Sequence, residues 1–348
     1  MIQIRAMRPR RPALAAAALT AGVAMALSAC GGGDGGGAGE GAGEEPASVA
    51  AVIKGLDNPF FQAMEKGITD GGAAAGVRTE VQSATSITDT TGQADKLTAL
   101  AGQDFDCYIV NPISGTNLVQ GLAQLAASGK PIVNIDSPVD PAAAEAAGIR
   151  LATYIGTDNF AAGQLAAEQM ARLLPDGGSV AIVGGISGDV TSSERVEGFR
   201  SGLPENITVL QEVAANWERQ EALTQATTII GANPDVKGFF AANDDMGLGV
   251  ARAVANAGRT GQISVISVDG NPDALTAVAN GELAATVAQY PYVIGKLGVD
   301  ACAAAARGAE LPQEVDAPVQ LVTKDNVQQA IDSAPEPPAP YDNPFASR

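Results

Sequence analysis

Short apolar runs rich in β-branched residues alternate with longer helical stretches through most of this chain of 348 residues. Parallel strands need a crossover connection, which is usually a helix, so this alternation predicts a parallel sheet with helices on both faces. The first series contains expected strands at 49–55, 77–83, 107–111, 132–136 and 151–156, with helical stretches such as 60–75 and 90–102 between them.

A second series of the same kind follows the first. Its expected strands are 180–183, 207–213, 238–242, 263–268 and 283–288, and its helices lie near 159–174, 218–231, 246–257 and 272–280. The chain length suits about two domains once an export segment and a flexible stretch are removed. The predicted fold class is therefore α/β, with two similar doubly wound parallel-sheet domains, and a ligand would bind beyond the carboxyl ends of the strands.

The first thirty residues have the pattern of a secretory signal. Arg5, Arg8 and further arginines precede an uncharged stretch at 13–27, which is too short and too rich in alanine to be a convincing permanent membrane span. The stretch ends in Leu-Ser-Ala-Cys at 27–30, which resembles the lipobox of bacterial lipoproteins, whose cysteine is acylated. We therefore expect a signal peptide at 1–30 with lipidation at Cys30, although Cys30 could also be only a small residue before the cleavage site.

Residues 31–47 are dominated by glycine, alanine and glutamate. This composition cannot bury enough surface to offset its ordering entropy, so we expect a flexible tether between the anchor and the globular part. The membrane would then be contacted only through the lipid anchor, and a soluble domain would be held at the extracytoplasmic face of the cell membrane.

Charge and composition exclude several classes of function. The formal net charge of −18 argues against a nucleic-acid partner, which needs clustered Lys and Arg. The chain contains no histidine, so a Ser-His-Asp triad and any His-ligated metal are excluded. We expect no catalytic residue, metal or cofactor. Cys107 lies in a strand-like run and Cys302 in an alanine-rich helical run, and we expect two buried free thiols rather than a disulfide.

Five expected strands end in an amide or a carboxylate. The segments are Lys54 to Phe61, Val110-Asn111-Pro112, Ile135-Asp136-Ser137, Ala242-Asn243-Asp244 and Val268-Asp269-Gly270. Any one of them fits a turn or a helix cap, but their recurrence at strand ends indicates a shared site. Polyhydroxyl ligands need this mixture, because each hydroxyl both donates and accepts a hydrogen bond.

Three aromatic side chains accompany these polar groups. Phe60 and Phe61 follow the first strand-end turn, and Trp217, the only tryptophan, lies in a polar loop. Aromatic rings pack against the apolar C–H faces of sugars. A core role is the alternative for the two phenylalanines, whereas a tryptophan in a loop favours a contact surface.

The motifs, taken in order and spacing, resemble those of the ribose-type periplasmic sugar-binding proteins, the type I solute-binding family of ABC transporters. The resemblance covers 49 to about 331. The segments that carry it are DNPFF at 57–61, VNP at 110–112, GTDN at 156–159, SERVEGF at 193–199, ANDDMGLG at 242–249, VDGNPD at 268–273 and LAATVAQ at 283–289.

The resemblance implies a ligand shell formed by both domains. Its members would be Asn58, Phe60, Phe61, Asn111, Asp136, Ser137, Arg195, Trp217, Asn243, Asp269 and Gln289. One position departs from the family: ribose binders usually follow the aspartate with an arginine, and here that residue is Ser137. The ligand is therefore expected to be a monosaccharide or polyol, such as a hexose, a sugar alcohol or a cyclitol, without assuming ribose.

The resemblance also implies three hinge crossings, near 157–158, 289–290 and 324. The N-terminal domain would comprise 48–157 and 290–324, the C-terminal domain 158–289 and 325–333, and residues 334–348 a disordered tail. Closure around the ligand would present the protein, as a monomer, to the permease subunits of an ABC importer.

The sequence leaves one alternative open and argues against two others. A lipid-anchored sensor subunit would present a sugar or a furanosyl signal to a receptor. A sugar-responsive repressor shares this fold but would need a DNA-binding segment where this chain has its export signal. A glycosidase could use Asp136 and Asp269 as its paired carboxylates, but hydroxyl recognition already explains both.

Overall fold

The computed structural model describes residues 47–346 and contains two six-stranded sheets. All strands of the first sheet are parallel, in the order β11-β5-β4-β3-β1-β2. These strands are β1 (Ser48–Ile53), β2 (Arg78–Ser83), β3 (Cys107–Val110), β4 (Ile132–Ile135), β5 (Thr153–Gly156) and β11 (Glu314–Asp316). The helices of this first lobe are α1 (Pro59–Ala75), α2 (Thr90–Ala101), α3 (Val119–Ser128), α4 (Pro141–Ala146) and α10 (Pro291–Ala306).

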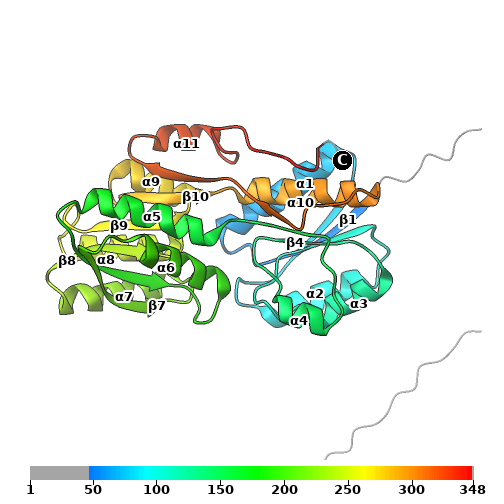
Figure 1. Cartoon of the computed structure of the whole chain (residues 1–348), viewed down its shortest axis with the longest axis horizontal. Coiled ribbons are helices and arrows are strands. Elements are labelled where there is room, and N and C mark those ends of the chain that lie inside the picture. The colour runs from blue at the N-terminus through cyan, green and yellow to red at the C-terminus, as the bar shows by residue number, and fades with distance from the viewer. Residues whose placement is uncertain (1–46, 347–348) are drawn as a thin grey trace, which may run out of the picture. The chain divides into compact units, whose positions relative to one another are not determined.

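The second sheet repeats this plan in the order β12-β10-β9-β8-β6-β7, with only β12 antiparallel to its neighbour. Its strands are β6 (Gly178–Gly184), β7 (Ile207–Ala214), β8 (Val236–Ala241), β9 (Ser264–Asp269), β10 (Ala285–Gln289) and β12 (Val319–Thr323). The helices of this second lobe are α5 (Asn159–Leu173), α6 (Val190–Gly202), α7 (Arg219–Ala232), α8 (Asp244–Asn256), α9 (Pro272–Asn280) and α11 (Val327–Ser333). The predicted α/β fold with two similar sheet domains is confirmed (Figure 1).

Burial on both faces explains why the strands are continuous apolar runs. In β1, Val49, Ala51 and Ile53 belong to the core that contains α1 and α10. Ala50 and Val52 point to the other face, where α2 and α3 cover the sheet. Helices on both faces leave no polar face on a central strand, as expected for a parallel sheet. The carboxyl ends of the strands are thereby left as the exposed edge at which a site can form.

The chain passes between the lobes after β5, after β10 and between β11 and β12. The first two passages fall where the sequence placed them. The third lies at 317–318, because β12 pairs with β10 in the second sheet. The expected N-terminal segment 290–324 therefore ends too late, and 319–323 belongs to the second lobe. Edge pairing with β10, rather than an interdomain turn near Lys324, decides the position of this segment.

The C-terminal residues 334–346 are ordered against α10, so the expected disordered tail is wrong for this part of the chain. Phe345 is only 1% exposed and joins the core beside α10. Asn343 donates a hydrogen bond to Asp300 at 2.8 Å, and Lys296 pairs with Glu336 at 3.0 Å. The proline-rich composition prevents a helix, but one buried aromatic ring is enough to fix the segment on the first lobe.

The inner cysteines form a disulfide, so the expectation of two free thiols is also wrong. Cys107 begins β3 and Cys302 lies on α10, with 5.6 Å between their Cα atoms. The two residues are 195 positions apart in the sequence. Their local sequences gave no sign of contact, because α10 returns to the first lobe only after the chain has built most of the second.

None of the helices among residues 47–346 is long and apolar enough to cross a membrane. The expected signal peptide at 1–30, Cys30 and nearly all of the expected tether at 31–47 lie outside the described residues.

Candidate functional site

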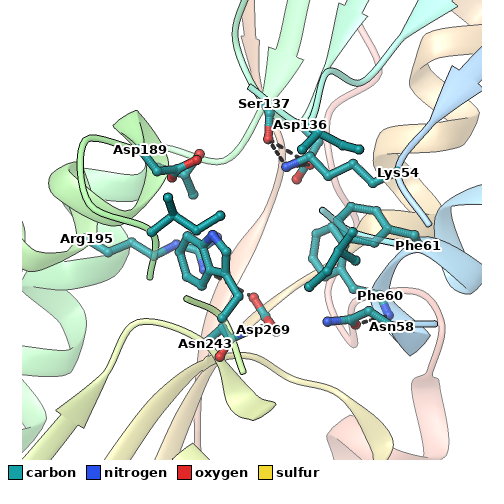
Figure 2. Close-up of a pocket in the computed structure, with 15 residues that line it drawn as sticks. Lys54, Asn58, Phe60, Phe61, Asp136, Ser137, Asp189, Arg195, Asn243 and Asp269 are labelled. Carbon is teal, nitrogen blue, oxygen red and sulfur yellow. Dashed lines mark hydrogen bonds and ion pairs between the residues drawn. The ribbon is translucent and has the colours of Figure 1, made fainter. Parts of the chain in front are cut away.

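A cavity of about 60 Å³ lies between the carboxyl ends of the two sheets (Figure 2). Both lobes contribute to its lining, which consists of Lys54, Asn58, Phe60, Phe61, Ile87, Ile113, Asp136, Ser137, Ile186, Asp189, Thr191, Arg195, Trp217, Asn243 and Asp269. All the predicted site residues except Asn111 and Gln289 are among them. We call this space the ring cavity.

The two phenylalanines form one wall of the ring cavity at the start of α1. Asn58 caps this helix, its side-chain oxygen accepting a hydrogen bond from the backbone N–H of Phe60 at 2.9 Å. The rings of Phe60 and Phe61 meet edge to face, with centroids 5.1 Å apart. Both side chains are largely buried, so they serve the core and the cavity together, and the two alternatives raised by the sequence are not exclusive.

Trp217 forms the facing wall from the loop before α7. Its indole lies over Gly185, where a Cβ atom would come within 2.3 Å of the ring. The guanidinium of Arg195 lies 5.9 Å from the centre of the same ring. Figure 2 shows Arg195 on one side of the cavity and Phe60 and Phe61 on the other. A flat apolar ligand face can therefore be held between aromatic rings of the two lobes.

The buried polar group of the second lobe is built around Arg195. Its guanidinium donates to the carbonyl of Ala242 at 2.7 Å and to Asp269 at 3.3 Å, and its Nε donates to Asn159 at 2.8 Å. Asp269 also accepts from the Gln289 amide at 2.7 Å. Burial raises the pKa of Asp269 to about 8, against the opposing effect of the Arg195 charge. The carboxyl of Asp269 thus lies close to a change of charge near neutral pH.

Asp244 supports this group from behind, and the sequence did not single it out as functional. It is fully buried and accepts hydrogen bonds from Ser267, Thr286 and the backbone N–H of Asn271. Through these contacts the start of α8 is joined to β9, to β10 and to the loop after β9. Asp269 is the last residue of β9. Burial raises the pKa of Asp244 to about 6. The sequence did offer one signal for this role, because Asp244 directly follows Asn243 at the end of a strand.

The polar group of the first lobe contains a residue that the predicted ligand shell omitted. Lys54 donates to the hydroxyl of Ser137 at 2.6 Å and lies 4.0 Å from a carboxylate oxygen of Asp136. Burial raises the pKa of Asp136, opposed chiefly by the charges of Lys54 and Arg195. Lys54 thus provides a cation beside the aspartate where ribose binders have an arginine. Its position directly after β1 could have indicated this role.

Unusual backbone conformations concentrate at the ring cavity. The non-glycine residues with positive φ within 47–346 are Asp136 at 60°, Asn216 at 51°, Trp217 at 65° and Asp269 at 135°. Asp136, Trp217 and Asp269 line the cavity, and Asn216 directly precedes Trp217. Such conformations are unfavourable for side-chain-bearing residues and persist where the surrounding structure and function require them.

Asn111 and Gln289 lie just behind the lining rather than in it. Both are buried, and the carbonyl oxygens of their side chains have no hydrogen-bond partner. The Gln289 amide donates to Asp269 at 2.7 Å, and the Asn111 amide donates to the sulfur of Met64 at 3.4 Å. An unpaired buried oxygen is costly, so each of these amides keeps an acceptor for a further hydrogen bond.

One hydrogen bond joins the lobes across the cleft. The Asn58 amide donates to Asp245 at 3.3 Å, and Arg219 holds Asp245 from the second lobe at 2.6 Å. The described residues contain no group of three or more His, Cys, Asp or Glu side chains that could hold a metal ion.

Two hinged α/β lobes around an aromatic and polar cavity define a binding protein for a small solute. The chain belongs to the periplasmic binding protein domain family, whose model matches residues 49–310.

Individual relatives agree with this assignment. The D-allose-binding periplasmic protein of Escherichia coli K12 is 35% identical over 256 residues, covering 73% of this chain and 82% of that protein. The ribose import binding protein RbsB of Bacillus subtilis 168 is 30% identical over 277 residues, covering 80% and 87%. A periplasmic solute-binding protein of an ABC transporter from Actinobacillus succinogenes, solved with bound D-allose, superposes with a TM-score of 0.77 at 29% identity, covering 81% of this chain and 99% of that one.

Proposed function

We propose that this protein captures a neutral monosaccharide or polyol in the ring cavity and delivers it to the permease of an ABC importer. The observation that carries the proposal is the placement of aromatic rings and hydrogen-bonded carboxylates from both lobes around one space. Carboxylates and amides serve the hydroxyls of a sugar, and aromatic rings serve its C–H faces. The relatives named above, which bind allose or ribose, support the same ligand class.

The charges in the ring cavity favour a neutral ligand. Its two cations are Lys54 and Arg195, and each lies beside an aspartate. Asp189 adds a third carboxylate. With both aspartates ionised, a sugar acid would find no uncompensated positive charge, and a neutral sugar should bind better than the corresponding uronic acid.

D-allose is the first ligand to test. Lys54 follows β1, whereas the arginine of ribose binders would stand at position 137, after β4. The cation beside Asp136 therefore comes from a different strand, and we expect the pattern of recognised hydroxyls to differ from that of a ribose binder. Among the relatives named above, the one at 35% identity is a D-allose-binding protein, which also favours this choice.

Hinge motion follows from the way in which both lobes enclose the ring cavity. Residues of both lobes line it and the hydrogen bond from Asn58 to Asp245 joins the lobes beside it, so the lobes must separate to admit a sugar. Contacts from both lobes then favour the closed state by the difference in ligand affinity between closed and open forms. The closed form would be the one that the permease recognises.

The cellular setting is part of the same proposal. Export with a lipid anchor at Cys30 and a Gly-rich tether would keep a monomeric protein at the extracytoplasmic face of the membrane. The disulfide between Cys107 and Cys302 supports this setting, since disulfides persist in oxidising compartments. Labelling with a radioactive fatty acid should mark the wild type and not Cys30→Ser. The sensor alternative has no observation in its favour.

Calorimetric titration tests the ligand proposal. The purified protein, freed of carried-over ligand in denaturant without reductant, would be titrated with pentoses, hexoses, polyols, cyclitols and uronic acids. We expect one-to-one binding of a neutral member, abolished by Trp217→Ala or Asp269→Ala and unchanged by Asp325→Ala on the exposed surface. A folded protein that binds no neutral member, or that prefers a sugar acid, would contradict the proposal.

A further inference from the structure

A second cavity, of about 310 Å³, opens beside the ring cavity at the same strand ends. It is lined by Thr88, Thr90, Ile113, Ser114, Gly115, Ser137, Pro138 and the loop residues 186–191. Five of the lining residues also line the ring cavity: Ile113, Ser137, Ile186, Asp189 and Thr191. The two spaces are therefore adjoining, and we call the larger one the outer cavity.

The walls of the outer cavity come from both lobes. Its first-lobe wall comes from the loops after β2, β3 and β4, and its second-lobe wall from the loop after β6. No hydrogen bond or ion pair joins these two walls, whereas Asn58 and Asp245 join the lobes beside the ring cavity. In this conformation the lobes are therefore joined beside the ring cavity, while the outer cavity remains wide enough for a ligand group.

The outer cavity has hydroxyl groups available to a ligand. The side chains of Thr90, Ser187 and Thr191 make no hydrogen bond to the described protein, and one carboxylate oxygen of Asp189 is also unpaired while the other caps α6. Apolar surface from Pro138 and Val190 lies among these groups. The lining contains no Lys or Arg, which disfavours a phosphate or another anion, and it suits a second neutral polyhydroxyl unit.

We propose that the protein binds a disaccharide or glycoside, with one ring in the ring cavity and the second unit in the outer cavity. This inference rests on the proposed function and extends its ligand class. Asp189 and Thr191, which line both cavities, would contact the linkage between the two units. The volume supports the assignment, because about 310 Å³ falls within the range of small-molecule sites.

A matched panel of sugars tests the inference. Each disaccharide, with 1→2, 1→3, 1→4 or 1→6 linkage, would be titrated beside the two monosaccharides that compose it and their methyl glycosides. We expect at least one disaccharide or glycoside to bind at least tenfold more tightly than its free units. If every extended sugar binds more weakly than its better free unit, the outer cavity is only a water-filled entrance and the inference is wrong. If no sugar of any size binds, the proposed function fails as well.

Filling the outer cavity gives an independent test. Ser187→Trp and Thr88→Trp each place a large side chain in it from opposite lobes, and neither residue lines the ring cavity. We expect at least a tenfold loss of affinity for the extended sugar and less than a twofold change for the free monosaccharide. Thr227→Trp, on the exposed face of α7, is the matched control and should change neither affinity. Equal losses for both sugars in the two filling variants would overturn the inference.

Discussion

At the scale of single residues, the site depends on pairs of opposite charge held out of water. Lys54 and Asp136 on one side, and Arg195 and Asp269 on the other, are each mostly buried. A buried charge without a partner is costly, so each pair is stable only as a unit. In the proposed function, the hydroxyls of the ligand would then meet groups whose orientation is already fixed.

Lys54→Met should weaken ligand binding by tenfold or more. The methionine retains the apolar stem, but Asp136 loses its nearby cation and its pKa rises further. Loss of a charged hydrogen bond is worth about 1.5 to 3 kcal/mol, which corresponds to roughly ten- to hundredfold in affinity. Calorimetry would measure the change. Lys66→Met, which removes a lysine from an exposed pair on α1, is the control. Equal affinities in wild type and Lys54→Met would remove Lys54 from the ligand shell.

Ligand affinity should rise between pH 6 and pH 8 through the ionisation of Asp269. Burial raises the pKa of this carboxyl in the free protein to about 8. A sugar hydroxyl that donates to the carboxylate favours the ionised form, so binding lowers this pKa and releases a proton below pH 8. The affinity then falls as the pH is lowered, by at most tenfold per pH unit.

Titrations at pH 7 in two buffers of different ionisation enthalpy would detect the released proton. Asp269→Asn should show weaker binding with no buffer dependence over the same range. Wild-type binding that is constant from pH 6 to pH 8 would show that Asp269 keeps one charge state throughout.

At the scale of helices and strands, the disulfide joins two elements that the sequence places far apart. It links β3 to the helix that covers the same face of the sheet, and both ends are fully buried. Closing a loop of 195 residues reduces the entropy of the unfolded chain by about 5 kcal/mol in the chain-entropy model, and native disulfides commonly contribute 2 to 5 kcal/mol.

The double variant Cys107→Ala/Cys302→Ala should therefore unfold at lower denaturant concentration, with a loss of roughly 2 to 5 kcal/mol. Neither cysteine lines the ring cavity, so the ligand affinity of the folded variant should match the wild type. Reduced wild-type protein provides the comparison that separates loss of the bridge from loss of side-chain volume. If Cys107 and Cys302 react as free thiols in unreduced, denatured protein, the two cysteines do not form a disulfide.

Most of the elements were predictable because each is encoded locally, whereas the short edge strands β11 and β12 were not expected. The apolar run of β3 and the Asn58-Pro59 start of α1 are visible within a few residues, and the strand ends then follow from the topology. The disulfide, the supporting role of Asp244 and the tail position of Phe345 were missed because each depends on contacts between distant segments. Lys54 was missed for another reason: the family pattern directed attention to the residue after Asp136 rather than to the end of β1.

At the scale of the whole described molecule, the C-terminal segment adds a further connection between the lobes. The chain leaves α11 on the second lobe and ends against α10 on the first (Figure 1), with Phe345 in the core beside α10. When the two lobes separate, we expect either the segment 334–344 to stretch or Phe345 to detach from the first lobe. The segment should therefore limit how far the lobes can open.

Phe345→Ala should lower stability and widen the range of opening. Removal of a buried phenylalanine ring typically costs 3 to 5 kcal/mol, and detachment of the segment also exposes the pairs Lys296–Glu336 and Asn343–Asp300 to water. Small-angle X-ray scattering of the ligand-free variant should give a larger radius of gyration than the wild type, while the liganded forms should agree. Phe160→Ala, at a position 37% exposed on α5, is the control. An unchanged radius with lowered stability would show that Phe345 serves the core of the first lobe alone, and that the tail does not restrain the hinge.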